Sequence, residues 1–127
     1  MSQDMQTPAL TTVWTEIPVT DLEAGAAFYR QVFGWEMPIT QMGPERVAAF
    51  GSGGVGGNLV AGPVAGGKGP VIHLLVPETV EAATERALAA GATTEGPLLS
   101  IPPGRYQVIH DPDGNRIGLF EPAMQGT

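Results

Sequence analysis

The chain has 127 residues, 43% of them hydrophobic, and a formal charge of −7 from 6 basic and 13 acidic residues. This length and composition predict one globular domain rather than a disordered chain. The lack of cysteine excludes disulfides, thiolate metal sites and cysteine nucleophiles, and the scattered basic residues disfavour nucleic acid and anionic membranes as partners. The sequence shows no signal peptide and no apolar stretch long enough to span a membrane, so we expect a cytoplasmic protein.

The first half of the chain predicts a strand followed by a helix, after a polar tail at residues 1–10. Apolar and polar side chains alternate over residues 12–19, a pattern typical of a strand. Thr20 and Glu23 match a capping box in which Thr20 is the N-cap. Apolar residues at helical spacing follow, and Gly34 is a C-terminal stop, so we expect a helix of about 13 residues.

Short apolar runs between glycines come next. Val47–Phe50 and Val55–Val60 predict antiparallel strands joined by tight turns. The alternative to strands and turns is a glycine-rich loop that binds phosphate. It is disfavoured, because neither a Walker motif nor a GxGxxG pattern between a strand and a helix is present. The glycine- and proline-rich stretch AGPVAGGKGP then predicts a linker, which we place at residues 63–70.

The second half repeats the order of the first. It predicts a strand at Val71–Val76 and a helix at Thr79–Ala90, which Gly91 ends and whose inward residues include Leu88. The remaining predicted strands are Leu98–Ile101, Arg105–His110 and Arg116–Phe120, with an Asp-Pro-Asp-Gly-Asn turn at 111–115 between the last two.

A fixed offset aligns the two halves and places Val19 on Val76 and Gly34 on Gly91. Two copies at so long a period indicate a duplicated domain rather than a solenoid. Two such modules side by side would bury their helix faces and leave a curved inner surface between them. The predicted domain covers residues 11–122, with module one at about 11–62, the linker at 63–70, module two at about 71–122 and a C-terminal tail at 123–127.

Two groups of motifs resemble those of one known family. The first group is IPVTDL at 17–22, AFY at 27–29 and VFGW at 32–35; the second is DPDGNRI at 111–117 and LFEP at 119–122. On these motifs the chain resembles the vicinal oxygen chelate superfamily, also called glyoxalase/bleomycin-resistance/dioxygenase. The resemblance implies an α+β fold in which two βαβββ modules form a cupped mixed β-sheet around a central cavity, and it implies a homodimer.

The same resemblance implies two metal ligands from each module, on its first and last strands. Carried over by position, these ligands fall on Trp14, on one of Gly56, Gly57 or Asn58, on Val71 and on Gly118. Indole nitrogen cannot bind a cation, and valine and glycine offer no ligating side chain. We therefore predict a family member without the usual divalent metal site, which disfavours lactoylglutathione lyase and extradiol dioxygenase activity. A metal remains the disfavoured alternative.

Glu16 and His73 fall on corresponding positions of the two repeats, two residues beyond the first-strand ligand positions and on the same face. Their side chains could point together into the cavity. One hypothesis makes them a general base and its orienting partner. A second makes them ligands of a displaced metal, and a third makes them a buried polar pair that satisfies itself.

The other candidates also have two interpretations each. Trp14 is either an aromatic wall of the cavity or a core residue. Arg105 either pairs with a substrate carboxylate or is a solvated strand end.

Our leading prediction is a metal-independent protein that binds a small molecule, with the drug-sequestering members of the family as the nearest analogue. The predicted cavity residues are Trp14, Glu16, Asn58, Val71, His73 and Gly118. The alternative is an enzyme, a lyase or isomerase rather than a hydrolase, that uses Glu16 and His73. A third hypothesis is a protein-interaction or regulatory domain with a vestigial cavity, because one fold supports many functions.

Overall fold

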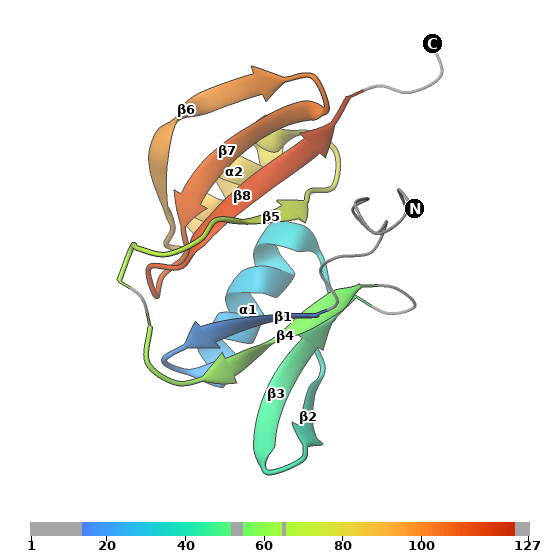
Figure 1. The fold of residues 1–127 in the computed structure, drawn as a ribbon, viewed down its shortest axis with the longest axis vertical. Coiled ribbons are helices and arrows are strands. Elements are labelled where there is room, and N and C mark those ends of the chain that lie inside the picture. Colours follow the sequence, from blue (N-terminus) through green and yellow to red (C-terminus); the bar gives the residue numbers. More distant parts are fainter. Residues whose placement is uncertain (1–13, 52–54, 65, 124–127) are drawn as a thin grey trace, which may run out of the picture.

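The computed structural model describes residues 14–51, 55–64 and 66–123. The predicted tail at 1–10, the first two residues of the predicted strand at 12–19 and residues 124–127 of the predicted C-terminal tail lie outside these ranges. The elements are β1 (Trp14–Val19), α1 (Leu22–Phe33), β2 (Ile39–Met42), β3 (Glu45–Phe50), β4 (Gly56–Ala61), β5 (Ile72–Leu75), α2 (Val80–Ala89), β6 (Thr93–Ile101), β7 (Gly104–His110) and β8 (Arg116–Pro122), as labelled in Figure 1.

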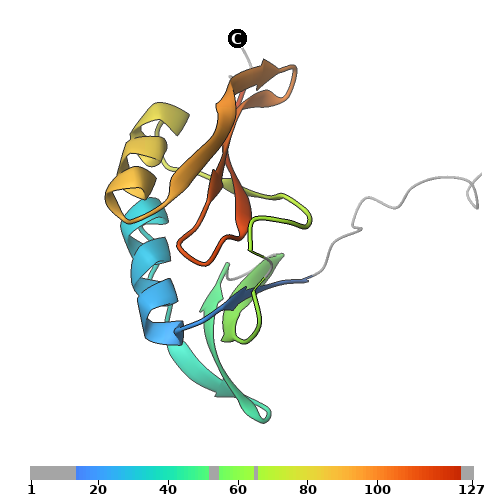
Figure 2. The ribbon, with the colours of Figure 1, turned by 90° about the vertical axis from the view of Figure 1, so that its left-hand side faces the viewer.

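Two four-stranded mixed sheets form the fold, in the orders β1-β4-β3-β2 and β5-β8-β7-β6. In each sheet the first strand pairs in parallel with the last, and the other pairs are antiparallel. This repeated topology confirms the predicted α+β fold of two βαβββ modules. Figure 2 shows α1 and α2 together on one side of the molecule and the strands of both sheets on the other. We call the sheet faces turned away from the helices the open faces.

The first helix begins one residue later than the capping box predicts. Asp21 is the N-cap, because its side chain accepts a hydrogen bond from the Ala24 N–H at 3.0 Å. Thr20 instead donates its hydroxyl to Asp113 Oδ1 at 2.6 Å, and Glu23 pairs with Arg46. The prediction of Thr20 as N-cap is therefore wrong, since a contact with the other module competes for its hydroxyl.

The predicted end of α1 is confirmed. Gly34 has a φ of 77° and donates its N–H to the Arg30 carbonyl at 2.9 Å, a left-handed cap that glycine adopts without strain. In α2 the prediction of Leu88 as an inward residue is wrong, because its side chain is 48% exposed. The buried stripe of α2 is Val80, Ala83 and Ala87, and Leu88 lies one residue, or about 100°, beyond it.

Two strands differ from their predicted ranges. β6 begins at Thr93, before the predicted Leu98, because the strand continues through a register shift between Glu95 and Leu99. Gly96 in this irregular segment has a φ of 72°, and a glycine in such a place is typical of a bulge. β2 has no counterpart among the predicted strands, since its ITQM sequence is mostly exposed and lacks an apolar run.

The core lies between the helices and the sheets. Ile17 and Leu59 of the first sheet, and Ile117 and Leu119 of the second, are fully buried on the helix side. A stack of aromatic rings from Tyr29, Phe33, Trp35 and Phe50 extends the core of module one. Packed side chains thus occupy the space between the helices and the sheets.

A buried network around Asp111 joins the two modules on the helix side. The Asp111 carboxylate accepts hydrogen bonds from the Tyr29 hydroxyl at 2.9 Å, from the Asn115 amide at 2.9 Å, and from the backbone N–H groups of Asn115 and Asp113. Asn115 also donates to the Pro18 carbonyl at 2.7 Å. Burial, and then the charge and hydrogen bond of Asp111, raise the pKa of Tyr29 well above its ordinary value. The network therefore needs a neutral Tyr29 hydroxyl as donor.

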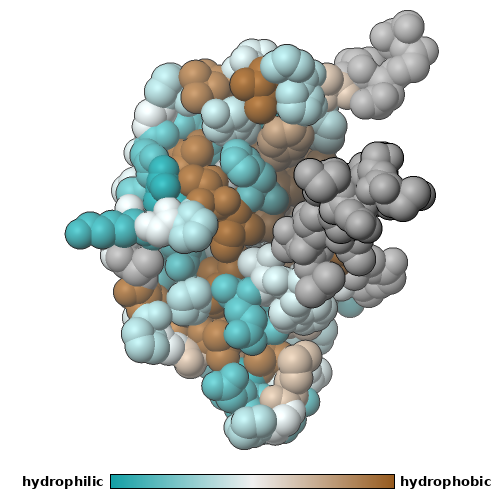
Figure 3. Space-filling view, viewed as in Figure 1, coloured by the Kyte–Doolittle hydropathy of each residue, from teal (hydrophilic) through white to brown (hydrophobic). Residues whose placement is uncertain are grey.

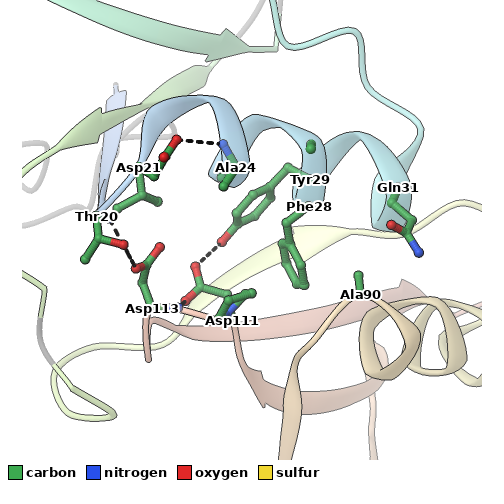
Figure 4. Close-up of a pocket in the computed structure, with 13 residues that line it drawn as sticks. Thr20, Asp21, Ala24, Phe28, Tyr29, Gln31, Ala90, Asp111 and Asp113 are labelled. Carbon is green, nitrogen blue, oxygen red and sulfur yellow. Dashed lines mark hydrogen bonds between the residues drawn. The ribbon is translucent and has the colours of Figure 1, made fainter.

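A groove of about 450 Å³ lies over this junction, between α1 and the turn that holds Asp111 and Asp113 (Figure 4). Its three carboxylates already have partners in the protein: Asp21 caps α1, Asp113 accepts from Thr20, and Asp111 accepts from Tyr29. We therefore assign the groove to the junction between the modules.

In the part of the chain that the structure describes, no helix is long and apolar enough to cross a membrane.

Candidate functional site

Apolar side chains gather on the open faces, mainly in module two. Side chains alternate along β5, so Ile72 and Leu74, which pair with buried residues of β8, face the helices, while His73 and Leu75 face away. Leu75 is 64% exposed. Leu99 and Ile101 of β6 are also exposed. Figure 3, drawn from the strand side, shows brown apolar surface along the middle of the molecule between polar groups.

Three rings form the centre of this surface, and we call His73, Tyr106 and Phe120 the aromatic platform. The His73 ring meets Tyr106 edge to face at a centroid distance of 5.1 Å and Phe120 at 5.9 Å. Gly118 lies directly opposite His73 in the register of β5 and β8. A methyl group at position 118 would overlap the imidazole, so glycine is what leaves room for the ring.

The open face of module one holds Trp14 and Asn58. The Trp14 indole N–H donates to Asn58 Oδ1 at 2.7 Å. Asn58 is fully buried, whereas Trp14 is 43% exposed. The structure thus brings together two of the predicted site residues, as an indole held by a buried amide.

Glu16 and His73 occupy equivalent positions, as the repeat predicts. Glu16 is paired with Asn58 in the first sheet, and His73 with Gly118 in the second. Both side chains are exposed, and within the described ranges no hydrogen bond or ion pair joins Glu16 to His73. The structure therefore presents them as separate groups on the two open faces.

A cavity of about 420 Å³ lies at the seam between β1, β4 and β5. Its lining includes Thr15, Phe50 and Gly56 from module one, and Val71 and His73 from module two. Val71, which lies just before β5, is half-buried there. His73 thus belongs both to the seam cavity and to the aromatic platform.

Arg105 lies apart from the other predicted site residues. Its guanidinium binds both oxygens of Glu81 at 2.7 and 2.8 Å and one oxygen of Glu121 at 2.5 Å. Hydrogen bonds to these two carboxylates raise the pKa of Arg105 further. The hydrogen bond from Arg105 lowers the pKa of Glu81, and the hydrogen bond from the Val80 backbone N–H, followed by that from Arg105, lowers the pKa of Glu121. Arg105 and Glu121 alternate along their strands with Tyr106 and Phe120, so Arg105 points toward α2 and away from the platform.

The positions that correspond to metal ligands do not fit a divalent ion. Asn58 Oδ1, the one side-chain oxygen among them, accepts the Trp14 N–H, and the space at Gly118 is filled by the His73 ring. Among the described residues there is no group of three or more His, Cys, Asp or Glu side chains that could hold a metal. Divalent sites need about three to six N, O or S ligands.

Phe120 and Leu75 are missing from the predicted site. Phe120 belongs to the closing motif LFEP and Leu75 to an apolar run, so both have the appearance of core residues. A signal for them does exist in the sequence. Side chains two apart on a strand share a face, so Phe120 must share the face of Gly118, and Leu75 that of His73.

Comparison with known proteins gives a family and a set of similar structures. The family described as Glyoxalase/Bleomycin resistance protein/Dioxygenase superfamily matches residues 11–119. A glyoxalase/bleomycin resistance protein from Albidiferax ferrireducens T118 has 21% identity and a TM-score of 0.68, with 87% of this chain and 97% of that chain covered. Curated proteins give no significant match.

Two further solved structures have more specific descriptions. TnmS3, an antibiotic binding protein from Streptomyces sp. CB03234, has 28% identity and a TM-score of 0.62, with 92% of this chain and 100% of that chain covered. The fosfomycin resistance protein FosX from Listeria monocytogenes has 19% identity and a TM-score of 0.66, with 94% and 98% covered. At these identities FosX is informative about the fold alone.

Proposed function

Because the chain belongs to the glyoxalase/bleomycin resistance protein/dioxygenase superfamily, we propose that it binds a small, largely apolar molecule on its open faces without a resident divalent metal. The observation that carries this proposal is the aromatic platform, in which His73 is exposed and Tyr106 and Phe120 are half-buried, while the helix side is packed. Aromatic and apolar walls with a few polar groups are typical of ligand sites. The description of TnmS3 as an antibiotic binding protein supports the same class of ligand.

His73→Ala is expected to weaken the binding of aromatic ligands at least tenfold. The change removes the ring that Tyr106 and Phe120 contact, and a stacked or edge-to-face contact contributes about 0.5–1.5 kcal/mol beyond the buried area. A panel of aromatic antibiotics would be screened by thermal shift, and the hits measured by isothermal titration calorimetry. Glu85→Ala, an exposed change on α2, is the control and should leave affinity unchanged. Unchanged affinity in His73→Ala would place the site elsewhere.

Metal analysis of the wild-type protein distinguishes metal-free binding from the enzymatic alternative. Metal content would be measured by plasma mass spectrometry, and thermal shifts recorded with nickel, zinc, manganese and iron(II). We expect substoichiometric metal and no stabilisation, because Asn58 and Gly118 are already engaged within the protein. Near-stoichiometric metal whose binding His73→Ala abolishes would favour the lyase or isomerase with Glu16 and His73 as ligands.

The exposed apolar residues of module two support a homodimer. Leu75, Leu99 and Ile101 are between 41% and 64% exposed, and Phe120 and Tyr106 lie between Leu75 and Leu99 across the sheet. Exposed apolar surface of this kind marks contact sites. A second copy over this surface would close the open side of the aromatic platform. We expect a dimer in sedimentation equilibrium and at least tenfold weaker self-association in Leu75→Glu. Leu88→Glu, on the exposed side of α2, is the matched control. A monomeric wild-type protein would contradict this prediction.

A further inference from the structure

The indole of Trp14 is held in one orientation by a contact across the sheet. Trp14 is paired with Gly56 in the register of β1 and β4, and Asn58 lies two residues further along β4 on the same face. The Trp14 indole spans this offset and donates its N–H to Asn58. Gly56 has no side chain to separate them, and a Cβ there would overlap the carbonyl oxygens of Phe50 and Gly51. The close approach of the Phe50 and Gly51 backbone thus requires glycine at this position, and the Trp14 indole reaches Asn58 two residues beyond it.

Core packing alone does not explain Asn58. Its side chain is fully buried, and a buried amide loses its hydration unless it is hydrogen-bonded. The contact of its Nδ2 with the Leu59 carbonyl is long, at 3.3 Å, while the contact of its Oδ1 with Trp14 is short, at 2.7 Å. A leucine would fill a similar volume without a polar group to satisfy. The distinctive contribution of the amide is the acceptor that it offers to the indole.

Trp14, in turn, is not a core residue. It is 43% exposed, although the ring is anchored at its nitrogen. A large rigid ring that is fixed at one edge and open to solvent is typical of a binding surface, because little conformational freedom remains to be lost when a ligand binds. Glu16, opposite Asn58 and two residues from Trp14 in β1, adds an exposed carboxylate to the same face. The net charge of −7 further favours ligands with positive charge.

From this arrangement we infer that Trp14 is a stacking surface for a planar aromatic cation, and that Asn58 is a positioning residue that acts through Trp14. The inference rests on the proposed binding function and defines the class of ligand. It also gives the Asn58 amide oxygen a role other than metal binding, since that oxygen accepts the Trp14 N–H.

The first test needs no ligand. In ¹⁵N-labelled protein the two tryptophans, Trp14 and Trp35, give two indole N–H signals, which Trp14→Phe assigns. We expect Asn58→Leu to speed the solvent exchange of the Trp14 indole proton at least tenfold, with the Trp35 signal unchanged. Unchanged exchange at Trp14 would overturn the positioning role of Asn58. The Trp35 signal also reports whether Asn58→Leu retains the fold.

The second test uses the planar cation 9-aminoacridine in fluorescence titrations. Trp14→Ala and Asn58→Leu are each expected to weaken its binding about tenfold, and the double variant no further, because both changes remove the same oriented ring. Glu16→Gln should weaken it less, by an amount that decreases with added salt.

If the wild type binds 9-aminoacridine and Asn58→Leu binds it equally well, this inference is overturned while the proposed binding function stands. If neutral aromatic probes bind the wild type and 9-aminoacridine does not, the class of ligand is wrong while the binding function remains. If no aromatic probe binds the wild type, the proposed function fails, and the role of Trp14 fails with it.

Discussion

Replacing Gly118 with alanine is expected to weaken the binding of aromatic ligands at least tenfold and to change the free energy of unfolding by less than about 1 kcal/mol. The added methyl group would overlap the His73 imidazole. Because His73 is exposed, the ring can swing away into solvent at little cost. That movement would break its edge-to-face contacts with Tyr106 and Phe120, and the platform would lose its shape.

Three variants separate this explanation from general damage to the fold. Gly62→Ala is the matched control, because a Cβ at that position meets nothing within 4 Å. His73→Ala should bind aromatic ligands as weakly as Gly118→Ala does, and the double variant no more weakly than either. Each of these variants lacks the imidazole at its place between Tyr106 and Phe120. Affinity would be measured by calorimetry and stability by urea denaturation. Wild-type affinity in Gly118→Ala would show that the position of His73 does not matter for binding.

The largest loss of stability is expected from Asp111→Ala, which should lower the free energy of unfolding by about 3 kcal/mol. Asp111 is only 3% exposed, and its carboxylate accepts from Tyr29 and Asn115. Without it, the Tyr29 hydroxyl would be a buried donor with no acceptor, and Asn115 would lose a partner. A buried polar group left unsatisfied costs about 1–3 kcal/mol.

Asp113→Ala is the matched control for Asp111→Ala, since it removes a carboxylate from the same turn. Asp113 accepts from Thr20 in an exposed contact, so its loss should cost about 1 kcal/mol or less. Tyr29→Phe should lower the free energy of unfolding by an amount between those of Asp113→Ala and Asp111→Ala, because Asp111 keeps its other donors. Urea denaturation at neutral pH measures all three. Equal effects of Asp111→Ala and Asp113→Ala would mean that the buried network does not hold the modules together.

Features that depend on neighbours in sequence could be predicted well. The stop at Gly34 and the start of α2 at Thr79 follow from the chemistry of a few adjacent residues, and both are confirmed. The repeat of Val19 at Val76 predicted a duplicated domain, and the family resemblance implied two βαβββ modules, which the sheet topology confirms. The metal-free character and the roles of Glu16 and His73 remain predictions, for which the experiments above are the tests.

The wrong predictions share a cause. Thr20 forms a hydrogen bond with Asp113, which lies 93 residues away in the chain. A contact at this distance depends on how the modules pack, and no local pattern encodes it. The apolarity of Leu88 predicts a core position, but Val80, Ala83 and Ala87 fill the narrow packing surface of α2.

The sequence by itself determined most of the elements, the duplication and the residue types available for chemistry, because caps and side-chain alternation act within a few residues. The tertiary structure decided which of those residues meet. It joined Trp14 to Asn58 across two strands, brought His73 against Tyr106 and Phe120, and directed Arg105 to Glu81 and Glu121. Strand register and the packing of helices on sheets set these contacts, since both depend on residues far apart in the chain.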